Sequence, residues 1–349
     1  MNSLFNQELS HRSSFIGWVA ILAALFFTCA IILLSGSSPV AVFHSIIIGA
    51  FATPDRFARV FTTLVPLLLC GCGLMFTFTA GLYNLGIEGQ IAFGAIAAMV
   101  PLQLGQSLPA PFLLLLAIVA GAVGGMLWGL LAGCLNVFGR INEIFAGLGL
   151  NFAVDGLALY LVFGPWKRPG VASMSGTEPL PEFLWLPTIG NTDASLISIS
   201  IAVIALYCTF LILRGSYFGL RLRAVGSNLR ASYVLGISSI RQLLSAFAIC
   251  GGLAGLAGAF QVIGVFHRLI PNISSNLGFL ALLVAMLART KVWVLLPIAL
   301  FFSVLTVGSL QLPLELSLES SLSGVLQGTL VLFILLSRGL NQFLNQRGV

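Results

Sequence analysis

Apolar runs about as long as a membrane-crossing helix follow one another along the whole chain of 349 residues. A helix needs roughly 20 apolar residues to cross the hydrocarbon core of a bilayer. Only 7% of the residues are charged, whereas a soluble domain carries about 25%. We therefore predict an all-α, polytopic membrane protein of about ten transmembrane helices, forming one transmembrane domain over residues 1–349. The apolar runs lie at about residues 15–35, 60–80, 85–104, 111–137, 144–163, 195–213, 243–264, 276–288, 292–311 and 320–337.

Two apolar stretches are too short to cross a bilayer as single straight helices. The run at 276–288 and the stretch Val40–Ala52 each have about 13 residues. We therefore expect at least one broken or short span, with Val40–Ala52 at the membrane interface. Because the runs fill the chain, a fused ATPase, a kinase domain and a large receptor domain are all excluded.

Lysine and arginine are unequally divided between the two sides of the predicted bundle. Cytoplasmic loops carry an excess of these residues. With a cytoplasmic N-terminus and ten alternating spans, eleven of the 16 fall in cytoplasmic segments and five on the other side. Both termini are then cytoplasmic. The long loop at about 214–242 is cytoplasmic, and the long loop at about 164–194 lies outside.

The polar residues show no pattern of an enzyme, a metal site or a nucleic-acid-binding protein. The three histidines are scattered, no GxxxxGK[ST] phosphate-binding loop occurs, and all six cysteines lie inside apolar runs. No Lys/Arg-rich run occurs, and the basic residues between the runs are best explained by orientation in the membrane, with contact to anionic membrane lipid as an alternative role for the arginines at 214–242. We therefore expect no catalytic residue, no bound metal, no cofactor in this chain and no nucleic-acid partner.

Ionisable residues inside membrane segments are costly and mark candidate functional sites. Glu88 lies in AGLYNLGIEGQ, where three glycines loosen the backbone and Asn84 and Gln90 add polar groups. If this stretch is helical, Asn84 and Glu88 share a face, because they are four residues apart. Broken polar helices form substrate sites in transporters, so Asn84, Glu88 and Gln90 are candidates for a substrate pathway. The alternative is that Glu88 caps backbone amides at a break and touches no substrate.

A second polar pair lies in the fifth run. Asn151 and Asp155 are also four residues apart and share one face of a helix. A polar stripe on an apolar helix faces the protein interior, where it either lines a pathway or bonds to a neighbouring helix. Glu143, at the start of the same run, is better explained as a carboxylate favoured by the helix dipole.

Glycine recurs at steps of three or four residues in two other runs. Small residues at this spacing let a neighbouring helix approach closely. We predict that both stripes are packing surfaces and that neither binds phosphate. The stripes are Gly121, Gly125, Gly129 and Gly133 in the fourth run, and Gly251, Gly255 and Gly258 in the seventh.

Four motifs in order give the chain a likeness to a known family. They are AGLYNLGIEGQ, NEIFAGLGLNFAVDGLALYLVFGPW, LRAVGSNLRASYVLGI and SNLGFLALLVAMLARTKVWVLLPIALFFSVL. This series spans about Val60 to Leu336. It resembles the permease subunits of bacterial ABC importers in the branched-chain amino acid, ribose and simple-sugar family, and it is most similar to the nucleoside-uptake branch.

The resemblance implies a permease in the bacterial inner membrane that takes up a small polar solute, with a nucleoside first and a simple sugar second. Such a permease works with a second permease subunit, which is either the same chain or a homologue. Two cytoplasmic ATPase subunits bind the ATP, and a periplasmic or lipid-anchored binding protein delivers the substrate. The loop at 164–194 is then periplasmic.

The resemblance also implies that the loop at 214–242 is the coupling loop, which docks in the ATPase. Within it, the residues that match the family's motif are Arg223, Gly226, Asn228, Ala231 and Gly236. Leu229 departs from the family pattern, because it stands where the family has proline after the asparagine. This departure affects how the coupling segment enters its helix.

The alternative function is a stand-alone secondary transporter or channel. It would need membrane carboxylates that bind a coupling ion, and only Glu88 and Asp155 qualify. It would also leave the long basic loop unexplained. A membrane enzyme, the third possibility, would need a catalytic cluster that the sequence does not show.

Overall fold

The computed structural model describes residues 22–105, 108–168, 176–190, 192–289, 291–319 and 321–347, together with residues 19 and 170. Within these residues all regular secondary structure is helical, apart from one isolated β-bridge between Lys167 and Thr177. The predicted all-α fold is confirmed. The described chain forms two compact units, one from the residues up to Val60 with those from Phe301 onward, the other from Phe61–Leu300.

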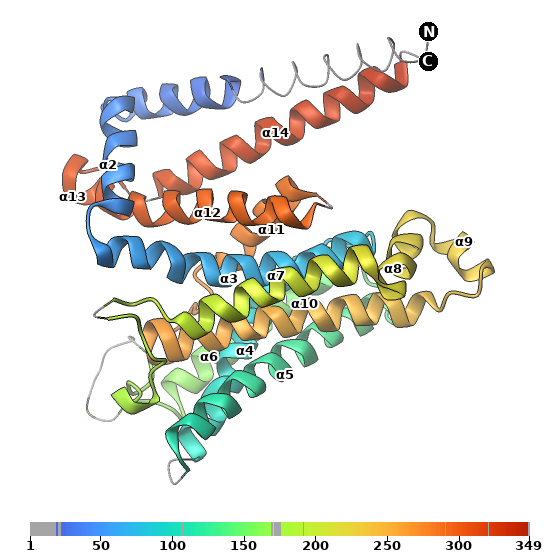
Figure 1. Cartoon of the computed structure of the whole chain (residues 1–349), viewed down its shortest axis with the longest axis horizontal. Coiled ribbons are helices and arrows are strands. Elements are labelled where there is room, and N and C mark those ends of the chain that lie inside the picture. The colour runs from blue at the N-terminus through green and yellow to red at the C-terminus, as the bar shows by residue number, and fades with distance from the viewer. Residues whose placement is uncertain are drawn as a thin grey trace. The chain divides into compact units, whose positions relative to one another are not determined.

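The helices are labelled as in Figure 1, where the colour follows the chain from blue to red. They are α2 (Pro39–Phe51), α3 (Pro54–Thr79), α4 (Ile87–Leu104), α5 (Ala110–Val137), α6 (Glu143–Phe163), α7 (Leu196–Gly215), α8 (Tyr217–Ser227), α9 (Leu229–Val234), α10 (Ser239–Gln261), α11 (Leu277–Ala288), α12 (Val292–Gly308), α13 (Leu312–Leu316) and α14 (Leu322–Arg347), with a π-helical end on α10 (Val262–Phe266).

Seven helices in the described chain are long and apolar enough to cross a membrane: α3, α4, α5, α6, α7, α10 with its π-helical end, and α12 continued into α13. A bent pair, Leu22–Leu34 with α2, brings the total to eight at most. The prediction of about ten spans is therefore not confirmed. Two apolar runs form helices too short to count, since α11 has only 12 residues and the apolar part of α14 is Leu322–Ser337.

In the first unit, α2 follows the helix Leu22–Leu34 after a bend of 100°. Pro39 occupies the first turn of α2, where its missing N–H is not needed. Val42 and Ile46 pack in an apolar core with side chains from the first helix, α12, α13 and α14. The stretch that we expected at the membrane interface is therefore a helix with one buried face.

In the second unit, the two glycine stripes hold α5 and α10 together. A Cβ atom at Gly125 would lie 2.5 Å from the Cα of Gly255, and one at Gly129 would lie 2.5 Å from the carbonyl oxygen of Phe247. The prediction of packing stripes is confirmed, and the structure adds that the two stripes pack against each other. α4 joins the same core through Gly94, which lies against Gly255.

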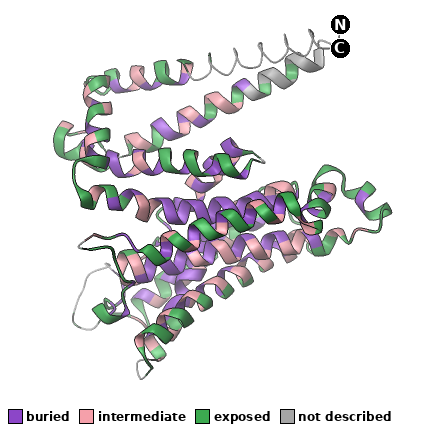
Figure 2. Ribbon diagram, in the orientation of Figure 1, coloured by how far each residue is buried: buried purple, intermediate pink, exposed green. Residues whose placement is uncertain are grey.

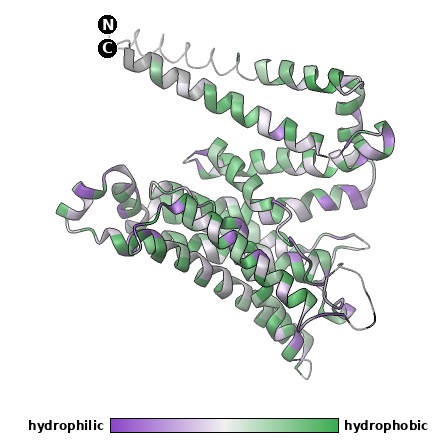
Figure 3. Ribbon diagram, turned by 180° about the vertical axis from the view of Figure 1, so that it is seen from behind, coloured by the Kyte–Doolittle hydropathy of each residue, from purple (hydrophilic) through white to green (hydrophobic). Residues whose placement is uncertain are grey.

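Burial differs among the helices of this second unit. Most of α4 and α10 is buried, whereas α5, α6 and α7 leave much of their surface exposed (Figure 2). Many large apolar side chains on these helices are exposed, and hydrophilic residues are most frequent at α8–α9 and in the loops (Figure 3). This pattern fits helices whose outer faces meet lipid or other membrane helices.

The long loop after α6 is tied to the end of α10. The backbone N–H of Leu180 donates to the carbonyl of His267 at 2.7 Å, and that of Thr177 donates to Leu269 at 2.9 Å. The N–H of Leu186 reaches Ile263 at 3.0 Å. α8 and α9 follow α7 and lead into the start of α10, so the two long loops lie at opposite ends of α10 (Figure 1).

Candidate substrate site and coupling segment

The chain between α3 and α4 is not helical. After α3, Gly81 takes a left-handed conformation with φ +78°, which glycine adopts without the cost that a side chain would bring. The residues after Gly81 are irregular, and α4 begins only at Ile87. The face that Asn84 and Glu88 would share in a continuous helix does not form, because Asn84 precedes the helix.

Asn84 closes this break with a full set of hydrogen bonds. Its Nδ2 donates to Gln90 Oε1 at 3.0 Å and to Cys250 Sγ at 3.1 Å. Its Oδ1 accepts from the backbone N–H of Gly86 at 3.2 Å and from Gln90 Nε2 at 3.3 Å. Because Cys250 lies near the middle of the candidate span Ser239–Phe266, the break lies near mid-depth of the helical bundle.

Asn151 of α6 supports the start of α4 from another direction. Its Oδ1 accepts from the backbone N–H of Gly89 at 2.8 Å, and its Nδ2 donates to the carbonyl of Leu85 at 3.0 Å. Beside it, a Cβ atom at Gly86 would lie 2.9 Å from the Cα of Gly147. Asn151 therefore bonds to backbone groups on both sides of Ile87, where the helix begins.

A second break precedes α11. Asn272, Ser275 and Asn276 have φ values of +57°, +48° and +61°, a left-handed conformation that costs roughly 1–2 kcal/mol for residues other than glycine. Irregular backbone inside a membrane is tolerated where it is buried in protein or lines a cavity. The start of α11 meets the start of α4, since a Cβ atom at Gly278 would lie 3.0 Å from the backbone nitrogen of Glu88.

A cavity of about 140 Å³ lies where the starts of α4 and α11 meet α6. Transporters place substrate sites between such discontinuous helices. The aromatic side chains in the lining offer flat surfaces, and the polar side chains offer mainly oxygen atoms. The lining residues are Glu88, Leu148, Asn151, Phe152, Asp155, Asn272, Ser274, Asn276 and Phe279.

Glu88 is the least satisfied polar group of this cavity. Its side chain is only 6% exposed, and neither carboxylate oxygen has a hydrogen bond of good geometry. The groups that face it are the Ser274 hydroxyl and the backbone N–H groups of Gly278 and Phe279. Glu88 therefore lies in the first turn of α4 and faces the first turn of α11, two helix N-termini that favour a negative charge.

The cavity has a one-sided charge. Glu88 and Asp155 both line it, and no lysine, arginine or histidine is among the residues of its lining. An anion would meet two carboxylates here without a counter-charge, in surroundings of low dielectric constant. The lining therefore favours a neutral ligand that donates hydrogen bonds, or a cation, over an anion.

The structure brings three of the five predicted pathway residues to this cavity. Glu88, Asn151 and Asp155 line it, whereas Asn84 and Gln90 are not in its lining and are fully buried. The hydrogen bonds of Asn84 and Gln90 instead hold the break between α3 and α4.

Three polar residues of the lining were not predicted from the sequence: Asn272, Ser274 and Asn276. The signal was present, because the polar run NISSN directly precedes the shortest apolar run of the chain. Polar residues beside a short span indicate a broken helix. A short apolar run of this kind predicts either a broken span or a helix that continues into its flank, and neither alternative by itself assigns these side chains to a site.

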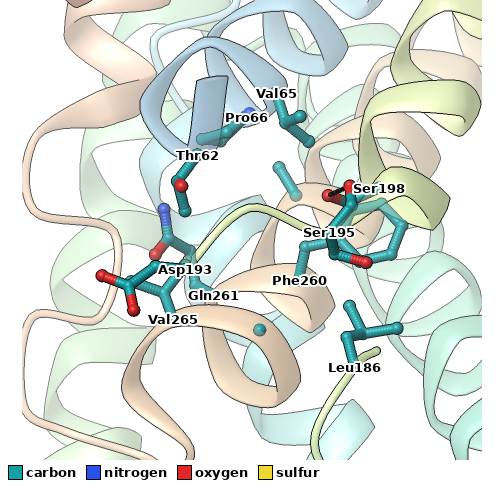
Figure 4. A pocket seen from close by; sticks show the side chains of 12 residues that line it. Thr62, Val65, Pro66, Leu186, Asp193, Ser195, Ser198, Phe260, Gln261 and Val265 are labelled. Carbon is teal, nitrogen blue, oxygen red and sulfur yellow. Dashed lines mark hydrogen bonds between the residues drawn. The ribbon is translucent and has the colours of Figure 1, made fainter. Parts of the chain in front are cut away.

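A second cavity lies at the C-terminal end of α10 and is too small for a solute. It has a volume of about 10 Å³, which is room for a single water molecule. In Figure 4 the polar ends of Thr62, Asp193 and Gln261 lie close together at this cavity. Gln261 Oε1 and Ser195 Oγ are buried there without a hydrogen-bond partner, so a water molecule fits both the space and the chemistry.

The segment 214–242 forms two short helices. Its five arginines have no acidic neighbour within the segment. Around α8 and α9 it exposes large apolar side chains, with Val234 at 85% and Tyr217 at 81%. A groove of about 430 Å³ lies between α8 and the end of α9. Exposed apolar groups beside a groove are typical of a protein interface.

The five predicted coupling residues shape this segment in different ways. Asn228 caps α9 by accepting the backbone N–H of Ala231 at 2.9 Å, so Leu229 starts the helix without the proline of the family pattern. Gly236 ends α9 with φ +77°. Arg223 is exposed and its Nε donates to the carbonyl of Gly219 at 3.4 Å. Gly226 is exposed, but a Cβ atom at this position would overlap the carbonyl oxygen of Thr79 at the end of α3.

With this geometry in place, comparison with protein families gives one match, to the permease component of branched-chain amino acid transport systems, over residues 56–335. The chain belongs to this family. It is the permease subunit of an ATP-binding-cassette importer and a multi-pass membrane protein. The resemblance noted in the sequence is thereby confirmed.

Three relatives of the permease illustrate the range of substrates. It is 27% identical to a glucose ABC transporter permease of Haloferax volcanii, over 96% of this chain and 92% of the relative. It is 28% identical to a guanosine ABC transporter permease of Bacillus subtilis, over 95% of each chain. It is 25% identical to a nucleoside ABC transporter permease of Lactococcus lactis, over 85% and 84% of the two chains.

Proposed function

We propose that this permease takes up nucleosides, and that they pass the cavity at the starts of α4 and α11. The observation that carries the proposal is the chemistry of that cavity, where two carboxylates, three amides and a hydroxyl stand beside Phe152 and Phe279. A nucleoside has a flat base that stacks on aromatic rings and N–H and O–H groups that donate to oxygen acceptors.

The same chemistry argues against other solutes of this family. An amino acid carries a carboxylate in addition to its ammonium group, and a nucleotide carries phosphate. Either would be placed next to Glu88 and Asp155 without a cation in the lining to balance it. A simple sugar remains the second candidate, because it is neutral and rich in hydroxyl groups, and because one relative is a glucose ABC transporter permease.

The ATPase subunits are proposed to dock on α8 and α9 from the cytoplasm. The support is the exposed apolar surface around Tyr233, Val234 and Leu235, which are 77%, 85% and 76% exposed. This surface lies at the end of α10 away from the long loop after α6. We propose a protein partner for this surface, because apolar side chains that are exposed to water are stabilised when a partner buries them.

The other partners are proposed on the same grounds. A substrate-binding protein docks on the periplasmic side, where a groove of about 620 Å³ runs between the loop after α6 and the end of α4, with Lys167 and Glu178 in its lining. A second permease subunit covers the exposed face of α6, since the charge of exposed Asp155 is costly against lipid. Both termini are cytoplasmic in this arrangement of the inner membrane.

The test is uptake of labelled guanosine into liposomes that contain the permease with its ATPase subunits and binding protein. Unlabelled adenosine, guanosine monophosphate, leucine and glucose serve as competitors. We expect adenosine to compete and the monophosphate and leucine to have no effect. Competition by glucose without competition by any nucleoside would transfer the assignment to sugars.

A further inference from the structure

We infer that α8 acts on the substrate cavity through one joint, the contact of Gly226 with the turn between α3 and α4, and that Asn84 holds this turn to the start of α4. The inference rests on the proposed function in one respect, namely that the ATPase docks on α8 and α9. It assigns Gly226 and Asn84 as positioning residues for transport, although neither lines the cavity.

The joint is a contact between two stretches of backbone. A Cβ atom at Gly226 would overlap the carbonyl oxygen of Thr79 and would lie 3.0 Å from the carbonyl carbon of Ala80 and from the nitrogen of Gly81. From the other side, a Cβ atom at Gly81 would lie 3.2 Å from the carbonyl oxygen of Gly226. With no side chain between them, a displacement of α8 is passed directly to the turn.

The rings of Phe76 and Phe218 form a second contact between α3 and α8, at the start of α8. Their centroids are 6.4 Å apart, so the end of α3 and the start of α8 are also in aromatic contact. Because close-packed elements have little free volume, they move together rather than past one another. α8 and the turn are therefore expected to move as one body.

From the turn, the chain leads within a few residues to the cavity. Gly81 is followed by the irregular stretch Leu82–Gly86 and then by Ile87, where α4 begins. Asn84 ties this stretch forward to Gln90 in the first turn of α4. A movement of the turn consequently reaches Glu88, which is between these two bonded residues in the sequence and lines the cavity.

The opposite wall of the cavity belongs to α11. It meets the start of α4 by close packing at Gly278 and through the Glu88 carboxylate, which faces the N–H groups of Gly278 and Phe279 without a hydrogen bond of good geometry. Since the Glu88 side chain makes no hydrogen bond of good geometry to α11, a movement of the start of α4 changes the distance between the two walls without breaking such a bond. The joint at Gly226 is therefore placed to change the width of the cavity at the contact between α4 and α11.

The variant Gly226→Ala tests the joint, with Gly215→Ala as its matched control. A Cβ atom at Gly215, at the end of α7, would have nothing within 4 Å. Both variants are assembled with ATPase subunits and binding protein in liposomes. For Gly226→Ala we expect normal co-purification with the ATPase and an unchanged KM for guanosine. Its kcat for uptake should fall by roughly tenfold, the scale of changes along a coupling route, while Gly215→Ala transports as the wild type does.

Normal kcat in assembled Gly226→Ala would overturn the inference. The proposed docking is tested separately by Val234→Asp, which should lose co-purification with the ATPase. If Val234→Asp kept the ATPase, the proposed docking would be wrong, whatever the result at Gly226.

A measurement on the wild-type complex covers the case in which Gly226→Ala does not assemble. Hydrogen–deuterium exchange is compared with and without ATP trapped by vanadate. We expect exchange to change together in α8–α9 and in Leu82–Gly86, with α5 as the unchanged reference. A change in α8–α9 with constant exchange in Leu82–Gly86 would show that movement reaches the membrane by another route and would overturn the inference.

Discussion

Asn84 and Glu88 come from one glycine-rich stretch, yet the fold gives them opposite surroundings. Both are buried, at 0% and 6% exposure. All four hydrogen-bonding sites of the Asn84 amide are used, whereas neither oxygen of Glu88 has a hydrogen bond of good geometry. The difference arises because Asn84 lies in the irregular turn, facing unpaired backbone, and Glu88 lies one residue inside α4, facing a cavity.

This comparison separates two uses of polar groups inside a membrane protein. A fully paired group fixes the position of the backbone, and its loss leaves other groups unpaired. A buried carboxylate without good hydrogen bonds does not stabilise the fold, because its burial costs free energy, but it remains available to a ligand. Substitution of Asn84 should therefore mainly lower stability, and substitution of Glu88 should mainly lower transport.

The largest effect is expected for Asn84→Leu. The substitution leaves the side chain of Gln90 and the backbone N–H of Gly86 without their present partners, at a cost of roughly 1–3 kcal/mol for each buried group. We expect a clear fall in the midpoint of thermal unfolding in detergent. Tyr83→Leu is the control, because Tyr83 is the adjacent residue and is 49% exposed. Equal midpoints for the two variants would contradict the role assigned to Asn84.

Much of the helical framework could be predicted from the sequence, because it follows from apolar length and small-residue spacing. The glycine stripes that include Gly125 and Gly255 predict close helix packing, and the structure places the two stripes in contact. Asn142 and Glu143 mark the start of α6, where Asn142 accepts the N–H of Ile144 at 2.9 Å. These are local rules that need no knowledge of distant residues.

The span count and part of the site could not be predicted in this way. The length of α11 depends on where left-handed residues such as Asn276 interrupt the chain, and hydropathy does not report backbone conformation. The partners of Asn84 include Cys250, 166 residues away. Spacing alone therefore placed Asn84 and Gln90 with Glu88, although long-range packing sends them to different surroundings.

An intermediate effect is expected for Glu88→Gln. The carboxylate has no hydrogen bond of good geometry to lose, so the free energy of unfolding should change by about 1 kcal/mol or less. Uptake of guanosine should fall, because the amide replaces an oxygen acceptor with a donor at the cavity. Uptake and unfolding are measured on the same preparation. A large loss of stability with normal uptake per folded molecule would show instead that Glu88 caps the start of α11.

The smallest effect concerns His267, a half-buried polar group, which lies where the loop after α6 docks on the end of α10. Its ring stacks on Trp185 with centroids 3.8 Å apart, and its Nδ1 is buried without a hydrogen-bond partner. Burial lowers the pKa of His267 from its ordinary value, and this outweighs the carbonyl of Ile263 and the charge of Asp193, which act in the opposite direction. The docked loop therefore favours the neutral ring.

The sign of the pH dependence follows from this lowered pKa. Since the docked state holds His267 neutral, its contribution to docking is complete above the ordinary histidine pKa of about 6.5. It is lost as the pH falls from there through the lower value of the docked state. Hydrogen–deuterium exchange of the loop at 176–186, corrected for the intrinsic effect of pH, should rise relative to α5 when the pH is lowered. His267→Phe keeps an aromatic ring beside Trp185 and should remove this dependence. A loop whose relative exchange rises equally in both proteins would show that the unpaired Nδ1 of His267 is not the group that responds to pH.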